Sequence, residues 1–118
     1  MTEWRLKSLA NERLMRMFGL ARRAGKLSYG YETVGALMKK NTAKAVFLST
    51  ETSERVKRNI ERISEETGCR AFIIADSMAD IGHAIGSKPT GVIALTDNGF
   101  ADAVCKIIEQ PQTDETED

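Results

Sequence analysis

Apolar residues recur along the chain at two different periods. Over residues 5–24 they follow the helical period, which predicts a long amphipathic helix that ends at Gly25. Residues 26–29 then form a short extended piece, and a second helix is expected over residues 31–40. The first part of the chain is therefore predicted to be two helices joined by a short extended connection.

After residue 44, short apolar runs alternate with helical patterns. The runs at 45–48, 71–75 and 91–95 predict strands that are buried on both faces. The helices between and after them are expected to begin at capping residues, which are Thr52 or Ser53, then Ser77, then Asp97. Buried strands that alternate with helices predict an α/β protein with three layers, an α/β/α sandwich.

Length and composition indicate one globular domain. The chain has 118 residues, of which 42% are hydrophobic and 29% are charged, so wholesale disorder is excluded. We assign residues 1–109 to a single domain and residues 110–118, which carry four acidic groups, to a disordered acidic tail. No apolar run approaches the roughly 18 residues of a membrane span, and no signal-like segment follows the N-terminus. We expect a cytoplasmic protein without a membrane partner.

The distribution of charge is more informative than its total, which is zero. Residues 1–44 hold ten Lys and Arg against three Asp and Glu, whereas residues 45–118 hold seven against fourteen. This asymmetry predicts a basic face with an anionic partner, and a solvated helix surface is the alternative. Basic residues cluster at the helix junction and again after the second helix, as Arg22, Arg23, Lys26, Lys39, Lys40 and Lys44.

Two further features of the junction favour RNA as that partner. Tyr29 and Tyr31 stand beside the basic residues, and aromatic faces near cations are typical of sites for unstacked bases. The start of the second helix, after Gly30, offers free backbone N–H groups and a positive dipole end to phosphate.

Candidate catalytic groups are few. His83 is the only histidine and has no metal-ligand spacing, so we expect a partly buried histidine at a helix end and no metal site. Cys69 and Cys105 lie in apolar patterns and are expected to be buried thiols of a reducing compartment. Asp76 and Asp97 follow two strands, which is compatible with a magnesium-binding receiver-like site, although helix capping is the favoured reading. No catalytic residue and no cofactor is predicted.

Four segments together resemble a known family. Leu20–Leu27, Gly30, Ala43–Leu48 and Gly82–Gly86 resemble, in order and spacing, the kink-turn-binding ribosomal protein family L7Ae/L30e, and most closely its bacterial YlxQ-type group. The resemblance runs over about residues 12–108 and implies the same α/β/α sandwich, with a mixed four-stranded sheet.

The resemblance also implies an RNA site at the start of the second helix. Members of the family read RNA there with a Gly-x-Asn-Glu motif, followed three residues later by lysine. In this chain Gly30 and Tyr31 match the first two positions, but Glu32 replaces the asparagine and Thr33 replaces the glutamate. The lysine is replaced by Ala36, and Lys40, one helical turn further on, is the candidate for the lost phosphate contact.

The family's second contact region is the loop before the last strand. Here that loop is 87–91, in which Lys88 is expected to meet phosphate, Pro89 to pack on a splayed base and Thr90 to lie beside them. Lys26 is added as a further phosphate contact from the basic junction. The predicted RNA surface thus combines the start of the second helix, the loop and three lysines.

The sequence therefore predicts a non-catalytic RNA-binding protein of ribosomal type that acts in bacterial translation or ribosome assembly. Its expected partners are structured RNA, such as ribosomal RNA, and ribosomal or translation proteins. The alternative is a protein-interaction module on the same fold, and a small enzyme or receiver that uses Asp76 and Asp97 is a third reading.

Overall fold

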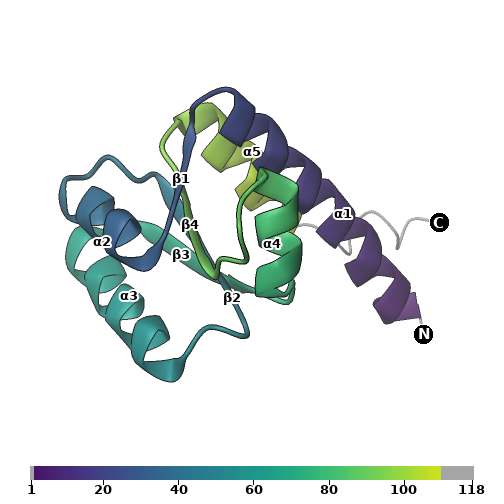
Figure 1. The fold of residues 1–118 in the computed structure, drawn as a ribbon, viewed down its shortest axis with the longest axis horizontal. Coiled ribbons are helices and arrows are strands. Elements are labelled where there is room, and N and C mark those ends of the chain that lie inside the picture. Colours follow the sequence, from purple (N-terminus) through teal and green to yellow (C-terminus); the bar gives the residue numbers. More distant parts are fainter. Residues whose placement is uncertain (1, 110–118) are drawn as a thin grey trace.

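A computed structural model describes the backbone of residues 2–109 and the side chains of residues 12–109. The elements alternate as the hydrophobic pattern predicts (Figure 1). In chain order they are α1 (Thr2–Arg23), β1 (Leu27–Tyr29), α2 (Tyr31–Lys39), β2 (Ala45–Ser49), α3 (Glu54–Thr67), β3 (Arg70–Ile74), α4 (Met78–Ile85), β4 (Val92–Leu95) and α5 (Asn98–Glu109). The predicted acidic tail, residues 110–118, lies outside the described residues.

The four strands form one mixed sheet in the order β1-β4-β2-β3. β2 and β3 run parallel, with Ala45 opposite Arg70, whereas β4 is antiparallel to both of its neighbours. In the centre of the sheet, Leu95 of β4 lies opposite Leu27 of β1 and Ala45 of β2. The mixed four-stranded sheet that the family resemblance implied is confirmed.

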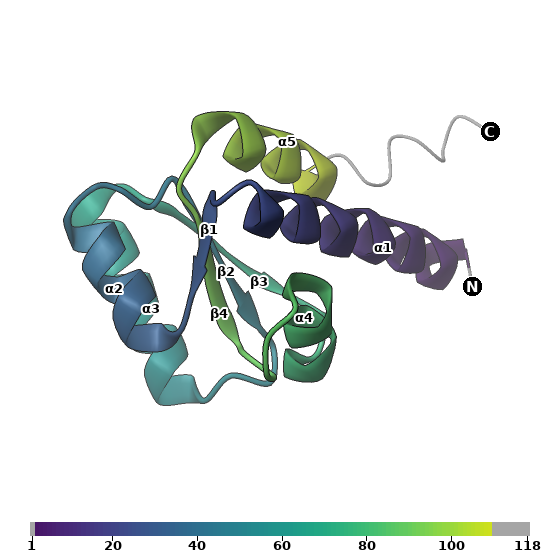
Figure 2. The same cartoon turned by 45° about the horizontal axis from the view of Figure 1, so that its top comes forward.

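Helices cover both faces of this sheet, so the predicted three layers are confirmed. In Figure 2, α2 and α3 lie on one side of the strands and α1, α4 and α5 lie on the other. Because side chains alternate along a strand, neighbouring residues of the central strands serve different cores. Val46, Leu48, Val92 and Ala94 pack beneath α2 and α3, whereas Phe47 packs against Phe18 of α1, with ring centroids 5.2 Å apart.

The outer strand β3 departs from the expectation of burial on both faces. Ile73 is 58% exposed and Phe72 is only partly buried, although Phe72 stacks on Phe47 at 5.5 Å. β3 has a neighbour on one side only, and the helices leave part of its surface uncovered. The apolar run at 71–75 is therefore that of an edge strand, and the prediction of full burial was wrong for it.

Side-chain caps fix where three helices begin. The Ser53 hydroxyl accepts a hydrogen bond from the Val56 N–H, the Ser77 hydroxyl from the Asp80 N–H, and the Asp97 carboxylate from the Phe100 N–H. Ser77 and Asp97 were predicted as caps, and Ser53 was one of the two candidates for the first cap, with Thr52. None of the helices in the described part of the chain is long and apolar enough to cross a membrane.

Candidate nucleic-acid interface

The β1–α2 junction and the loop before β4 meet at one edge of the sheet. The Gly30 N–H donates to the Val92 carbonyl at 2.9 Å, so the residue that opens α2 is tied to the residue that opens β4. The loop 87–91 leads directly into that end of β4. We call this surface, made of residues 30–33 and 87–91, the Gly30 edge. The two segments that the family resemblance singled out are thus adjacent.

Gly30 is required at the edge by its backbone conformation. Its φ of +102° and ψ of +137° lie in a region that residues with a Cβ rarely adopt. A Cβ built at Gly30 would meet only the Thr33 Oγ1 atom, at 4.0 Å, so space is not the constraint. Because Gly30 supplies no side-chain cap, the first N–H groups of α2 have no capping acceptor.

The loop of the Gly30 edge is held against α4 by a close backbone approach. A Cβ at Gly82 would lie 2.4 Å from the Lys88 carbonyl oxygen, so only glycine fits there. The Thr90 N–H also donates to the Met78 carbonyl at 3.1 Å. These contacts leave Lys88 and Pro89 exposed, whereas Thr90 is 9% exposed and offers little surface to a ligand.

The first turn of α2 presents two of its three predicted side chains to solvent. Glu32 and Thr33 are exposed, whereas Tyr31 is half-buried and its hydroxyl accepts a hydrogen bond from the Asn59 side-chain amide. The Asn59 side-chain oxygen Oδ1 in turn accepts a hydrogen bond from the Arg62 guanidinium at 2.6 Å. This chain of contacts connects the Gly30 edge to α3.

Arginines of α3 extend this surface, and the sequence analysis missed them. Arg55, Arg58 and Arg62 recur at helical spacing and line, with Glu54 and Asn59, a cavity of about 550 Å³. The signal in the sequence was their common face on the helix. On the same helix Lys57 pairs with Glu54 at 3.7 Å, and Arg62 contacts Asn59.

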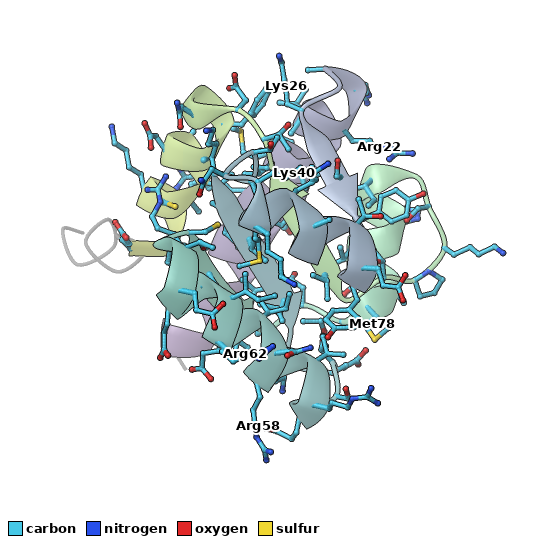
Figure 3. All side chains as sticks on the ribbon, turned by 90° about the vertical axis from the view of Figure 1, so that its left-hand side faces the viewer. Arg22, Lys26, Lys40, Arg58, Arg62 and Met78 are labelled. Carbon is cyan, nitrogen blue, oxygen red and sulfur yellow. The ribbon has the colours of Figure 1, made fainter. Side chains whose placement is uncertain are left out.

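Lys26 and Lys40 lie at the opposite end of the sheet from Gly30. Lys26 precedes Leu27, which pairs with the last residue of β4, whereas Gly30 bonds to the first. Lys40 caps the far end of α2. In Figure 3, Lys26 and Lys40 lie with Arg22 in the upper part of the molecule and Arg58 lies at the bottom. The structure therefore does not join these two lysines to the Gly30 edge.

The receiver-like reading of Asp76 and Asp97 is wrong. Because β3 and β4 run in opposite directions, the residues that follow them lie at opposite ends of the sheet. Asp97 caps α5, but Asp76 caps nothing, since Ser77 holds the start of α4. Residues 12–109 contain no group of three or more acidic, histidine or cysteine side chains that could hold a metal ion.

Asp76 is nevertheless unusual. It is 7% exposed, and its Oδ1 atom has no hydrogen-bond partner among the described residues. Burial raises the pKa of this carboxyl, and the nearby Asp80 raises it further. Asp76 lines a cavity of about 590 Å³ between α1 and α4, together with His83, which is exposed rather than partly buried as expected.

The cysteines are both free thiols, as predicted. Cys105 is buried on α5, whereas Cys69 is only partly buried and its thiol donates to the Ala43 carbonyl at 3.4 Å. Burial raises the pKa of both thiols. A thiol with a raised pKa holds its proton more tightly, which does not favour a nucleophile.

Comparison with known proteins identifies the family of this chain. Residues 12–105 match the Ribosomal protein L7Ae/L30e/S12e/Gadd45 family, and the chain belongs to that family. It is 37% identical over 98 residues to the RNA-binding protein YlxQ of Enterococcus faecium, a match that covers 83% of this chain and 93% of the relative. It is 27% identical to the RNA-binding protein YlxQ of Bacillus subtilis (strain 168), over 79% and 92% of the two chains.

Two solved structures share the fold. A Bacillus halodurans protein of unknown function superposes with a TM-score of 0.77 and 24% identity, over 81% of this chain and 96% of the other. The Giardia lamblia 15.5kD RNA binding protein superposes with a TM-score of 0.68 and 16% identity, over 91% and 88% of the two chains.

Proposed function

We propose that this chain is a non-catalytic RNA-binding protein that acts in bacterial translation or ribosome assembly, in the cytoplasm. The observation that carries the proposal is the juxtaposition of the α2 start and the loop 87–91, fixed by the 2.9 Å bond from the Gly30 N–H to Val92. Membership of the family and the names of the two bacterial relatives support RNA as the ligand.

The Gly30 edge suits the RNA backbone better than it suits base edges. The uncapped N–H groups at the start of α2 and the exposed Lys88 ammonium can meet phosphates. Pro89 is exposed beside Lys88 and can pack on a splayed base. Glu32, when ionised, only accepts hydrogen bonds and repels phosphate, so it cannot replace an asparagine that reads guanine.

The test compares two variants for binding to a kink-turn RNA and to a control whose tandem G·A pairs are destroyed. Lys88→Ala should flatten the dependence of log affinity on log salt by about 0.7–0.9 and weaken both RNAs equally, since phosphates carry no sequence information. Glu32→Asn combined with Thr33→Glu and Ala36→Lys should gain preference for the kink turn, because this triple change restores the family's reading set.

Lys106→Ala serves as the matched control, because Lys106 is an equally exposed lysine on α5, away from the Gly30 edge. It should keep the salt slope of the parent protein. The site assignment fails if the folded triple variant shows no new preference and Lys88→Ala also keeps the parent slope. A parent protein that captures only protein partners and no RNA would favour the interaction-module reading.

A further inference from the structure

Six basic residues gather at the end of the sheet opposite to the Gly30 edge. They come from three separate parts of the chain: the last turn of α1, the turn before β1, and the end of α2 with the turn that follows it. Figure 3 shows three of the labelled basic residues, Arg22, Lys26 and Lys40, in the same upper region of the molecule. We call this surface the Lys26 end, and its members are Arg22, Arg23, Lys26, Lys39, Lys40 and Lys44.

Strand pairing fixes the spacing of this surface. The Thr96 N–H donates to the Lys26 carbonyl at 2.9 Å, and the Lys44 N–H donates to the Leu95 carbonyl at 2.8 Å. Lys26 and Lys44 thus flank the end of β4 on its two sides, and two strand spacings put their backbones about 10 Å apart. The Lys44 ammonium also donates to the Asn41 carbonyl at 3.1 Å, which holds it beside the end of α2.

The basic side chains of the Lys26 end stand outside the ion pairs of the described residues. Within residues 12–109, none of the six basic side chains forms an ion pair. Arg70, which starts β3 at the same end, shows the contrast, because it pairs with Asp102 at 3.3 Å. The Asp97 carboxylate, also at this end, is engaged by the Phe100 N–H.

Helix dipoles explain only part of this arrangement. Arg22, Arg23 and Lys39 stand in last helical turns, where cations are favourable. Lys26 and Lys44 lie outside the helices and gain nothing comparable. The Arg22 guanidinium is also held over the Tyr29 ring, 4.9 Å from its centroid, so one cation of the surface is positioned in advance.

We infer that the Lys26 end is a second phosphate-binding surface, which holds the backbone of the same RNA at a place remote from the Gly30 edge. Duplex RNA matches it well, because a duplex of similar charge density to DNA carries about one charge per 1.7 Å of its axis, counting both strands, so several phosphates lie within the roughly 10 Å that this surface spans. The two surfaces are separated by the length of α2, about 15 Å from Gly30 to Lys40. The partner is therefore a folded RNA whose backbone reaches both ends. This inference rests on the proposed function.

The experiment measures how binding of purified bacterial ribosomal RNA depends on salt. Lys26→Gln combined with Lys40→Gln should flatten the slope of log affinity against log salt by about 1.4–1.8, since two phosphate contacts are lost. Both side chains are exposed, so the thermal midpoint should stay near that of the parent. The control is Arg16→Gln combined with Lys106→Gln, which removes the same charge from two exposed positions elsewhere and should leave the slope unchanged.

The outcomes separate the two proposals. If the parent protein binds RNA and the Lys26/Lys40 variant keeps the control's slope, the second surface does not exist, whereas the Gly30 edge is untouched. If the parent shows no salt-dependent RNA binding, the proposed function fails and the second surface fails with it. If polyglutamate displaces the RNA as well as a polyribonucleotide of equal charge does, the surface fits acidic proteins and the assignment to RNA is overturned.

Discussion

The two ends of β4 differ in what the backbone and the side chains contribute. At the Gly30 edge the backbone dominates, through a glycine at positive φ, an uncapped helix start and a loop seated closely on α4. Charges are mixed there, with Glu32, Glu51 and Glu54 standing among Lys88, Arg55 and Arg58. At the Lys26 end two helix ends and the turns beside them carry six basic residues, none of which forms an ion pair within residues 12–109.

The defined backbone shape and the excess of positive charge thus lie at different ends of the sheet. At the Gly30 edge the backbone geometry is fixed, but Glu32, Thr33 and Ala36 stand where the family resemblance implies base-reading residues. Six basic residues without an ion pair among the described residues lie at the other end, where the cations can attract phosphate without selecting a sequence. We expect this protein to bind the phosphate backbone of RNA. The Gly30 edge would set the orientation of the RNA, and both ends of the sheet would contribute to the affinity.

The largest effect should come from breaking the backbone packing of the Gly30 edge. Gly82→Ala would place a Cβ 2.4 Å from the Lys88 carbonyl oxygen, so the loop must move or α4 must shift. We expect a loss of about 1–3 kcal/mol in the free energy of unfolding, measured by denaturant titration. The Lys26 end should be unaffected. The variant should therefore keep the part of the slope of log RNA affinity against log salt that this surface contributes.

Gly35→Ala is the matched control for this loss. Gly35 also lies inside a helix, but a Cβ there would meet only the Ile63 Cδ1 atom, at 3.8 Å, which is an ordinary contact. Alanine is favoured over glycine in a helix by up to about 1 kcal/mol, so this variant should be as stable as the parent or more stable. Equal stability of the Gly82→Ala and Gly35→Ala proteins would contradict the close packing of the loop.

Much of the fold followed from the sequence because local signals specify it. Apolar periodicity located each helix and strand to within a few residues, and Ser53, Ser77 and Asp97 marked the starts of three helices. Strand direction cannot be predicted from such local signals, because a run of buried apolar residues has the same pattern in a parallel and in an antiparallel strand. The reversed β4 is the reason that Asp76 and Asp97 lie at opposite ends of the sheet.

The sequence predicted several residues of the candidate site, but it did not predict which of them lie together in space. Gly30 and the loop 87–91 were placed together through the family resemblance, since no local pattern links segments so distant in sequence. Lys26 was assigned to the same surface because it is close to Gly30 in sequence. The extended chain of β1 nevertheless separates the two residues by four steps, or about 13 Å. The α3 arginines were missed because their role depends on the bond between Asn59 and Tyr31, which only the packing of α2 on α3 creates.

A smaller effect should come from Asp76, which is on the Gly30 side of the sheet. Its pKa is raised in the folded protein above the ordinary value of 3.8, so the folded state favours the protonated form. The contribution of Asp76 to stability is therefore largest below pH 3.8 and is lost as the pH rises through the raised value. At neutral pH Asp76→Asn should raise the free energy of unfolding by on the order of 1 kcal/mol, because it removes a buried charge whose Oδ1 atom has no hydrogen-bond partner among the described residues.

The advantage of the Asp76→Asn protein should shrink on acidification and disappear below pH 3.8, where both proteins carry a neutral side chain. Thermal midpoints measured across this range check the prediction. Asp80→Asn is the control, because Asp80 is exposed and should show little change. An Asp76→Asn protein that is less stable than the parent at neutral pH would mean that the carboxylate is stabilised by a contact in the folded protein.

The smallest effect should come from Arg22, which joins the Lys26 end to β1. Its guanidinium lies 4.9 Å from the centre of the Tyr29 ring, and at a partly exposed site such a contact contributes about 0.5–1 kcal/mol. Arg22→Ala should lower the free energy of unfolding by about that amount, and Arg22→Lys by less, since lysine keeps the charge but loses the planar stacking. A double-mutant cycle with Tyr29→Leu isolates the contact, since the loss from Arg22→Ala should be smaller when the ring is absent. If the two changes simply add, the guanidinium is not held by the ring, and Arg22 is as free to move as the exposed lysines beside it.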